Sequence, residues 1–94
     1  LPGEYNLSQN YPNPFNPSTN INFSIVDASE VSLKVYDLSG KEINELANNF
    51  YTPGTYNVIW DATDSYGNQV SSGIYIYQLK TNDGILSNSM ILMR

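Results

Sequence analysis

Two aspartates near the middle of this 94-residue chain, Asp61 and Asp64, come nearest in type and spacing to a metal site. They precede Tyr66-Gly67-Asn68, so two carboxylates and a loop carbonyl could bind Ca²⁺, which prefers oxygen ligands. Their spacing departs from the D-x-[DN]-x-[DN]-G pattern of a calcium loop. We favour the alternative, in which both side chains accept hydrogen bonds from their own backbone in turns. The prediction is therefore no metal and no other cofactor.

Catalysis by a nucleophile and a base needs residue types that the sequence lacks. There is no histidine and no cysteine, which removes the commonest general base and the thiol nucleophile. Nine acidic residues remain, and a pair of carboxylates could in principle hydrolyse a glycosidic bond. These acids fall in predicted turns or on solvent faces of predicted strands, and a domain this small has little room for a cleft. The sequence indicates that the chain is not an enzyme.

Tyrosines are a further candidate chemistry, because the sequence contains eight of them. Tyr66, Tyr75, Tyr77 and also Tyr36 could form an aromatic platform that binds sugars. The alternative is that these side chains pack in the core or lie half-exposed on a sheet. We favour the second interpretation and keep a carbohydrate-binding module as an alternative.

The charge balance and the length of the apolar runs exclude two classes of partner. Nine acidic residues against four basic residues give a net charge of −5, so the surface repels nucleic acid. No apolar run is long enough to cross a bilayer as a helix. We therefore expect no nucleic-acid binding and no membrane insertion.

The elements that would position these side chains begin with a stiff segment, Asn10–Thr19, of sequence NYPNPFNPST. Each proline fixes its own φ angle and lacks an N–H, so this run cannot be a helix or a central strand. Residues that precede proline are pushed toward extended conformations. We expect residues 1–19 to form a proline-rich N-terminal segment that packs on the rest of the domain through Phe15 or Tyr11.

Short runs of alternating apolar residues then predict β-strands. Six clear runs lie at Ile21–Ile25, Val31–Tyr36, Glu42–Leu46, Tyr56–Trp60, Ile74–Lys80 and Leu86–Met93. A seventh short strand is expected at Tyr5–Ser8, and a loop at Ala47–Thr52. The run Ile74–Lys80 is apolar on both faces, so it suits either a fully buried strand or one with a tyrosine-lined outer face. The fold class is all-β, with residues 1–94 forming a single Ig-like antiparallel β-sandwich of about seven strands.

Several motifs occur in an order and spacing known from one protein family. NYPNPFNPST is followed by INFSI, VSLKVYDLSGKEI, PGTYNVIWDATDSYGNQVSSGIYIYQLK and finally SMILMR. This pattern resembles the type A C-terminal sorting domain of the type IX (Por) secretion system. It is also similar to the Ig-like domain of flagellar hook-capping proteins. The residues of the first motif are Asn10, Tyr11, Pro12, Asn13, Pro14, Phe15, Asn16 and Pro17.

The resemblance implies that the domain is an address for a larger protein, of which this chain would be the C-terminal end. An upstream cargo domain would fold in the periplasm. The outer-membrane secretion apparatus would then recognise the sorting domain, and its signal peptidase or sortase would cleave it. The implied location is the periplasm in transit, and afterwards the medium or the cell surface. The alternatives are a structural Ig-like accessory domain and a carbohydrate-binding module of a secreted enzyme.

The last strand is the predicted recognition element, together with two turns. Family members often carry two lysines just before the last methionine, where this sequence has Asn88 and Ser89. Only Arg94 supplies a basic charge there, and we expect this terminal charge to be exposed. The candidate recognition residues are Met90, Ile91, Leu92, Met93, Arg94, Gly40 and Gly73.

Overall fold

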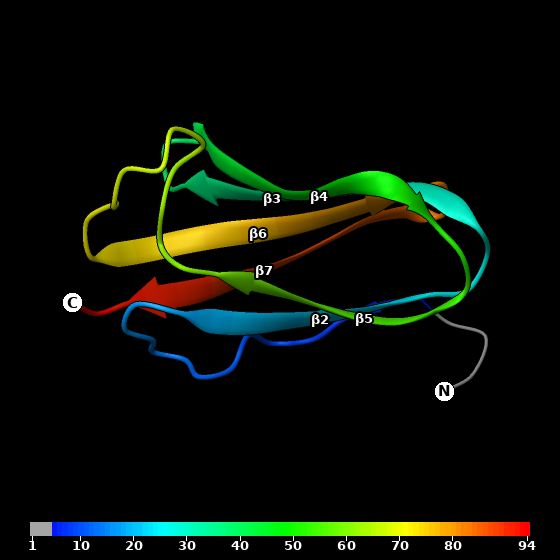
Figure 1. The fold of residues 1–94 in the computed structure, drawn as a ribbon, viewed down its shortest axis with the longest axis horizontal. Helices are drawn as coiled ribbons and strands as arrows, with labels where there is room; N and C mark the ends of the chain where they lie inside the picture. Colours follow the sequence, from blue (N-terminus) through cyan, green and yellow to red (C-terminus); the bar gives the residue numbers. More distant parts are fainter. Residues whose placement is uncertain (1–4) are drawn as a thin grey trace.

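Residues 5–94 are described by the computed structural model, and they form two antiparallel β-sheets packed face to face (Figure 1). The strands are β1 (Asn6–Leu7), β2 (Thr19–Ile25), β3 (Ser29–Asp37), β4 (Glu42–Tyr51), β5 (Gly54–Trp60), β6 (Gly73–Thr81) and β7 (Gly84–Leu92). One sheet has the order β1-β2-β5 and the other has the order β4-β3-β6-β7. The predicted antiparallel sandwich of about seven strands is confirmed. No helix capable of spanning a membrane occurs among the described residues.

The core lies between the two sheets and follows from the alternation of apolar residues along each strand. In β2 and β3 every second side chain is buried, because neighbouring side chains of a strand point to opposite faces of the sheet. Trp60 is 1% exposed and packs edge-on against Tyr75, with ring centroids 5.4 Å apart. Met90 and Leu92 of the last strand also point into this core.

Strand β6 places its tyrosines on the inner face. Tyr75 and Tyr77 are buried, whereas Ile74 is 45% exposed on the outer face. Both predicted alternatives, a strand buried on both faces and a tyrosine-lined outer face, are therefore wrong. The inward orientation holds because each phenol ring fills core volume while its hydroxyl reaches a backbone carbonyl at the edge of the core. Those carbonyls belong to Ser71 and Ser8.

Strand β4 continues through Tyr51, so the expected loop at Ala47–Thr52 is wrong. The second half of β4 pairs with the first half of β3, from Leu33 opposite Ala47 to Ser29 opposite Tyr51. Backbone pairing with β3 makes this segment a strand. Its side chains give no strand signal, because three consecutive exposed residues interrupt the alternation. Tyr51 packs against Phe23 and Tyr56 at this end of the core.

Candidate functional site at one end of the sandwich

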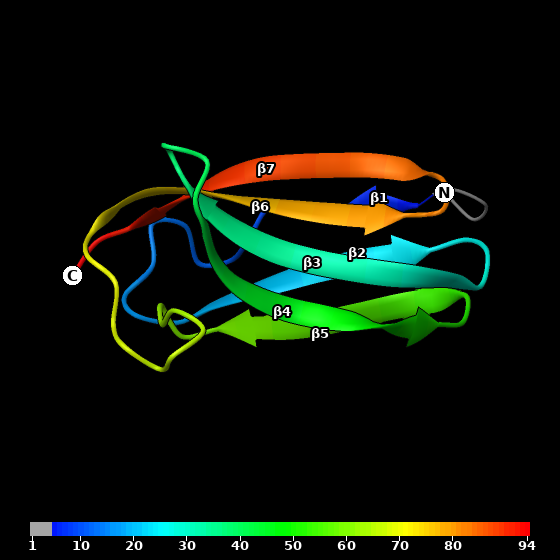
Figure 2. The same ribbon diagram turned by 90° about the horizontal axis from the view of Figure 1, so that it is seen from above.

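Four separate parts of the chain meet at one end of the sandwich. The proline segment, the β3–β4 turn, the loop between β5 and β6 and the last residues all lie at the left of Figures 1 and 2. The segments that carry Gly40, Gly73 and Arg94 therefore lie at the same end of the sandwich, although they are far apart in the sequence. The opposite end holds the β2–β3, β4–β5 and β6–β7 connections.

The proline segment covers the outer edge of β7. The N–H of Phe15 donates to the carbonyl of Ile91 at 3.0 Å, and the N–H of Met93 donates to the carbonyl of Phe15 at 2.9 Å. The side-chain Oδ1 of Asn13 accepts the N–H of Ile91 at 2.9 Å. Phe15 and Leu92 thus form a parallel bridge, and the motif residues complete the edge of the terminal strand.

Phe15 is the aromatic residue of the segment that enters the core. It is 2% exposed and its ring lies 5.8 Å from that of Trp60, whereas Tyr11 is 77% exposed. Tyr11 instead pairs through its backbone with Asn20 of β2. The peptide bonds that precede Pro12, Pro14 and Pro17 are all cis.

A buried polar cluster fixes the start of this segment. Asn10 is 2% exposed; its N–H donates to the Tyr77 hydroxyl at 2.8 Å, and its Nδ2 donates to Thr19 Oγ1 at 3.0 Å. The Tyr77 hydroxyl donates in turn to the carbonyl of Ser8 at 2.7 Å. Burial raises the pKa of Tyr77 above its ordinary value, so the phenol stays neutral and keeps its donor proton. Sequence analysis missed this role for Tyr77, and only its position in an apolar strand hinted at burial.

The predicted recognition residues of the last strand divide into two groups. Met90 and Leu92 are 0% and 1% exposed, so they belong to the core. Ile91 and Met93 are 40% and 57% exposed on the outer face, where Ile91 pairs with Ile74 of β6. A partner of the folded domain can therefore contact only the second group.

Arg94 is exposed, as expected, and its guanidinium forms three hydrogen bonds within the domain. Nε donates to the carbonyl of Val70 at 2.7 Å, Nη1 to Gln69 Oε1 at 3.1 Å, and Nη2 to the carbonyl of Ala62 at 3.2 Å. The planar fork of donors suits three acceptors held in one loop. Ser72 Oγ also accepts the N–H of Arg94 at 2.9 Å. The residue therefore ties the end of β7 to the β5–β6 loop.

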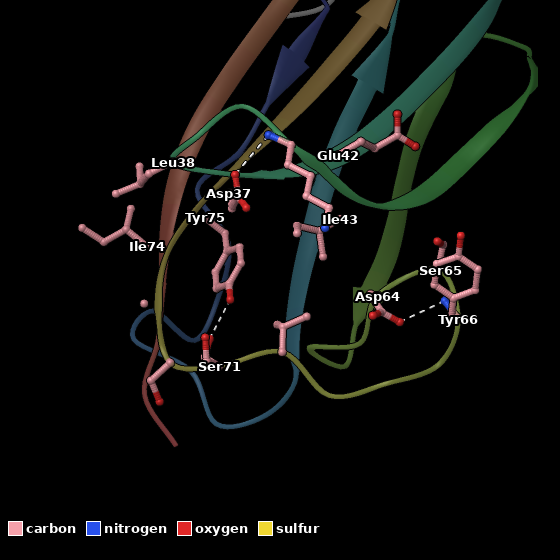
Figure 3. A pocket seen from close by; sticks show the side chains of 14 residues that line it. Asp37, Leu38, Glu42, Ile43, Asp64, Ser65, Tyr66, Ser71, Ile74 and Tyr75 are labelled. Atoms are coloured by element: carbon pink, nitrogen blue, oxygen red, sulfur yellow. Dashed lines mark hydrogen bonds between the residues drawn. The ribbon is translucent and has the colours of Figure 1, made fainter.

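A groove of about 500 Å³ lies between the β3–β4 turn and the β5–β6 loop (Figure 3). Its lining includes Leu38, Glu42, Tyr66, Gly73 and Ile74. The side chains of Tyr66 and Leu38 are largely exposed at its rim, at 88% and 66%. Both turns that sequence analysis singled out therefore contribute to one concave surface.

The β3–β4 turn is closed by the carboxylate of Asp37. Its Oδ1 accepts the N–H of Ser39 at 2.9 Å, the hydroxyl of Ser39 at 2.6 Å and the N–H of Lys41 at 3.0 Å. The Ser39 hydroxyl and the Lys41 N–H lower the pKa of Asp37 below its ordinary value. Gly40 takes a φ angle of +89°, which a residue with a Cβ rarely adopts.

The two calcium candidates are both used within their own loop. Asp64 Oδ1 accepts the N–H groups of Tyr66 and Asn68, each at 2.9 Å, and Asp61 Oδ1 accepts the Thr63 hydroxyl. Across residues 5–94, no cluster of three or more acidic, cysteine or histidine residues could hold a metal ion. The geometry is that of turns capped by their own side chains.

The proposed tyrosine platform is absent from the described surface. Tyr75 and Tyr77 are buried at 6% and 0% exposure, and Tyr36 is half-buried in β3. Only Tyr66 of the four is largely exposed. The interpretation as core packing is therefore confirmed for the two tyrosines of β6.

Comparison with known proteins places the chain among Ig-like domains. The sequence model of the FlgD Ig-like domain family matches residues 13–84. No curated protein matches the chain.

Three solved structures share the fold. PorU from Porphyromonas gingivalis, a dimeric latent form, superposes with a TM-score of 0.76 and 20% identity, covering 96% of this chain and 9% of its own. PorZ, a surface component of the type-IX secretion system of the same organism, superposes with a TM-score of 0.64 and 23% identity. The match covers 92% of this chain and 11% of PorZ. FlgD from P. aeruginosa superposes with a TM-score of 0.61 and 26% identity. The match covers 79% of this chain and 57% of FlgD. The chain thus spans about a tenth of PorU and PorZ.

Proposed function

The chain belongs to the FlgD Ig-like domain family, and from this premise we propose that it is a sorting domain for type IX secretion. In this proposal it directs an attached cargo protein through the outer-membrane secretion apparatus. The signal peptidase or sortase of that apparatus then removes it, and the cargo passes from the periplasm to the medium or the cell surface.

The observation that carries the proposal is the pairing of the proline motif with the terminal strand. The motif and the last strand are the two ends of the sequence pattern that resembles sorting domains. In the structure they are joined through Asn13, Phe15, Ile91 and Met93. The fold likeness to PorZ, an essential surface component of the type-IX secretion system of P. gingivalis, adds support.

The exposure of the last strand limits what a receptor reads on the folded domain. Ile91 and Met93 are exposed, and Ile91 pairs with Ile74, which lines the groove. The buried Met90 and Leu92 keep the strand in place. In this proposal the receptor therefore contacts the exposed apolar side chains of Ile91 and Met93 at the end of β7, rather than the basic side chain of Arg94.

The test is export of a fluorescent reporter that carries a periplasmic leader and residues 1–94 at its C-terminus. The host has a working type IX apparatus, and an isogenic strain without the apparatus is the control. We expect the reporter to reach the medium or the cell surface only in the first strain. Accumulation of folded, intact fusion in the periplasm of both strains would contradict the proposal.

A pair of matched variants locates the signal. Ile91→Ser with Met93→Ser should reduce export, because it removes the exposed apolar pair. Ile85→Ser changes the same face of β7 at its other end, where the side chain is 55% exposed, and should leave export unchanged. Equal export by both variants would place the signal outside the last strand.

A structural accessory domain is the second candidate, favoured by the match to the FlgD family and the 26% identity to FlgD from P. aeruginosa. In that case the domain would stabilise its upstream neighbour without moving it across a membrane. A fusion that stays periplasmic, yet melts at a higher temperature than the neighbour alone, would favour this reading.

A further inference from the structure

The three-stranded sheet carries no charged residue on any of its strands. Its strands β1, β2 and β5 read NL, TNINFSI and GTYNVIW, although the whole sequence has nine acidic and four basic residues. The side chains that point away from the core are amides, hydroxyls and one isoleucine: Asn6, Asn20, Asn22, Ser24, Thr55, Asn57 and Ile59. The lower layer in Figure 1 thus presents a neutral polar face.

Tyr11 extends this face by one further position. It forms an antiparallel bridge with Asn20, and Asn20 pairs with Ile59 on its other side. Residues directly opposite one another in a sheet point to the same face. Tyr11, Asn20 and Ile59 therefore form a row across the sheet, and the tyrosine is 77% and the isoleucine 65% exposed.

Hydrogen bonds orient four of the polar side chains of the face, those of Asn20, Asn57, Ser24 and Thr55. Asn57 Nδ2 donates to Asn20 Oδ1 at 3.1 Å, and Asn20 Nδ2 donates to the carbonyl of Tyr11 at 3.3 Å. The hydroxyls of Ser24 and Thr55 lie 3.2 Å apart. Asn22 pairs with Asn57 across the two strands and lies on the same face. An array ordered in this way loses little side-chain entropy when a ligand binds.

We propose that this face binds a neutral polysaccharide chain. Each amide both donates and accepts hydrogen bonds, and this matches sugar hydroxyls, which do the same. Tyr11 and Ile59 supply exposed apolar surface at the margins of the row, where the C–H face of a sugar ring packs. A charged polymer would gain no ion pair here. The site differs from the four-tyrosine platform and does not depend on the sorting function.

The test is affinity electrophoresis of the 94-residue chain through gels that contain one soluble polysaccharide each. The neutral probes are β-glucan, xylan, mannan and dextran, and the anionic probes are alginate and polygalacturonate. We expect at least one neutral probe to retard the chain and neither anionic probe to do so. Tyr11→Ala should weaken the retardation about five- to tenfold, since aromatic contacts of this kind have that size.

Matched variants separate this face from general surface effects. Tyr66→Ala removes a tyrosine that is 88% exposed on another part of the molecule and should change nothing. Asn22→Leu keeps the face uncharged but removes hydrogen-bonding groups, and it should weaken binding. Circular dichroism checks that each variant is folded.

Three outcomes would overturn the proposal. The first is no retardation by any neutral probe. The second is equal loss of binding in Tyr11→Ala and Tyr66→Ala. The third is concentration-dependent self-association, measured by analytical ultracentrifugation, that buries the same residues against a second copy through the outer edge of β5.

Discussion

A few buried hydroxyl and amide groups hold the start of the proline segment against the core. Tyr77 lies in the middle of β6 but bonds to Ser8 and Asn10, which are 69 and 67 positions away in the sequence. Its hydroxyl accepts from one backbone group and donates to another, so both are satisfied within the protein. A buried backbone group without a partner would instead carry a desolvation penalty.

Tyr77→Phe is therefore expected to destabilise the domain by about 1–3 kcal/mol, because it leaves the Asn10 N–H unpaired. The Ser8 carbonyl would keep only the longer contact from Asn88 Nδ2 at 3.4 Å. Urea denaturation followed by circular dichroism measures the loss. The control is Tyr66→Phe, which removes an exposed hydroxyl and should leave the midpoint unchanged. Identical midpoints for both variants would show that the Tyr77 hydrogen bonds do not hold the segment.

Asp37 should give the domain a pH dependence in the acid range. Its pKa in the folded state lies below the ordinary 3.8, first because of the Ser39 hydroxyl. The stabilisation is therefore complete above pH 3.8 and is lost as pH falls through the folded-state pKa. NMR titration of the carboxyl carbon should give a midpoint below 3.8, and Asp37→Asn should remove this part of the acid destabilisation. A midpoint at or above 3.8 would contradict the prediction.

At the scale of strands and loops, the β5–β6 loop is held in place by contacts with residues distant in sequence. Arg94 bonds to Ala62, Gln69 and Val70, and Asn44 of β4 donates to the carbonyl of Thr63. The loop also supplies one wall of the groove. Its shape therefore depends on the end of β7.

Arg94→Ala should loosen this loop while the two sheets stay intact. We expect faster amide hydrogen exchange at residues 62–72 and only a small drop in melting temperature, because surface hydrogen bonds contribute little to global stability. Arg94→Lys should not restore the slow exchange, since an ammonium group lacks the fork of donors. Lys80→Ala, at an exposed position of β6, is the control. Unchanged exchange in Arg94→Ala would mean that the guanidinium does not hold the loop.

The strands were largely predictable because one face of each is buried and alternation makes this visible. Two errors show where alternation fails. In β4, Asn48 and Asn49 interrupt the apolar alternation after Ala47. The strand continues through them because their backbone pairs with β3. In β6, isoleucine and tyrosine alternate, so the pattern reveals a strand but not which face is inside. Packing of the Tyr75 and Tyr77 rings decides the face.

For the whole molecule, a single tryptophan joins the two sheets and the proline segment. The Trp60 ring contacts Phe15 and Tyr75, and its Nε1 donates to the carbonyl of Thr63 at 2.8 Å. These partners come from three different parts of the chain. Its removal should therefore weaken the fold as a unit.

Trp60→Ala is expected to cost about 3–5 kcal/mol, which is a large share of the about 5–15 kcal/mol that holds a typical domain. The midpoint of thermal unfolding, measured by circular dichroism, should fall strongly or the variant should be unfolded. Ile59→Ala changes the next residue, which points outward, and should have little effect. A Trp60→Ala variant as stable as the Ile59→Ala control would contradict the central position of this side chain.

The candidate site was predictable in parts but not as an assembly. The proline motif, the two turns and the last strand each carry a sequence signal, such as proline spacing or a glycine in a turn. Their meeting at one end depends on strand order, which alternation does not encode. The hydrogen bonds of the Arg94 guanidinium reach back 24 to 32 positions, so no local pattern could reveal them.

The parallel bridge between Phe15 and Leu92 has a mechanical consequence. Tension applied on the upstream side of Asn13 and beyond Leu92 pulls the two segments in opposite directions along their length. The bonds of Asn13 and Phe15 to Ile91 and Met93 are then loaded together in shear, rather than peeled apart one by one. We infer that the domain resists stretching along this axis. Single-molecule pulling should show a lower rupture force for Asn13→Ala than for the unaltered chain, and equal forces would refute the inference.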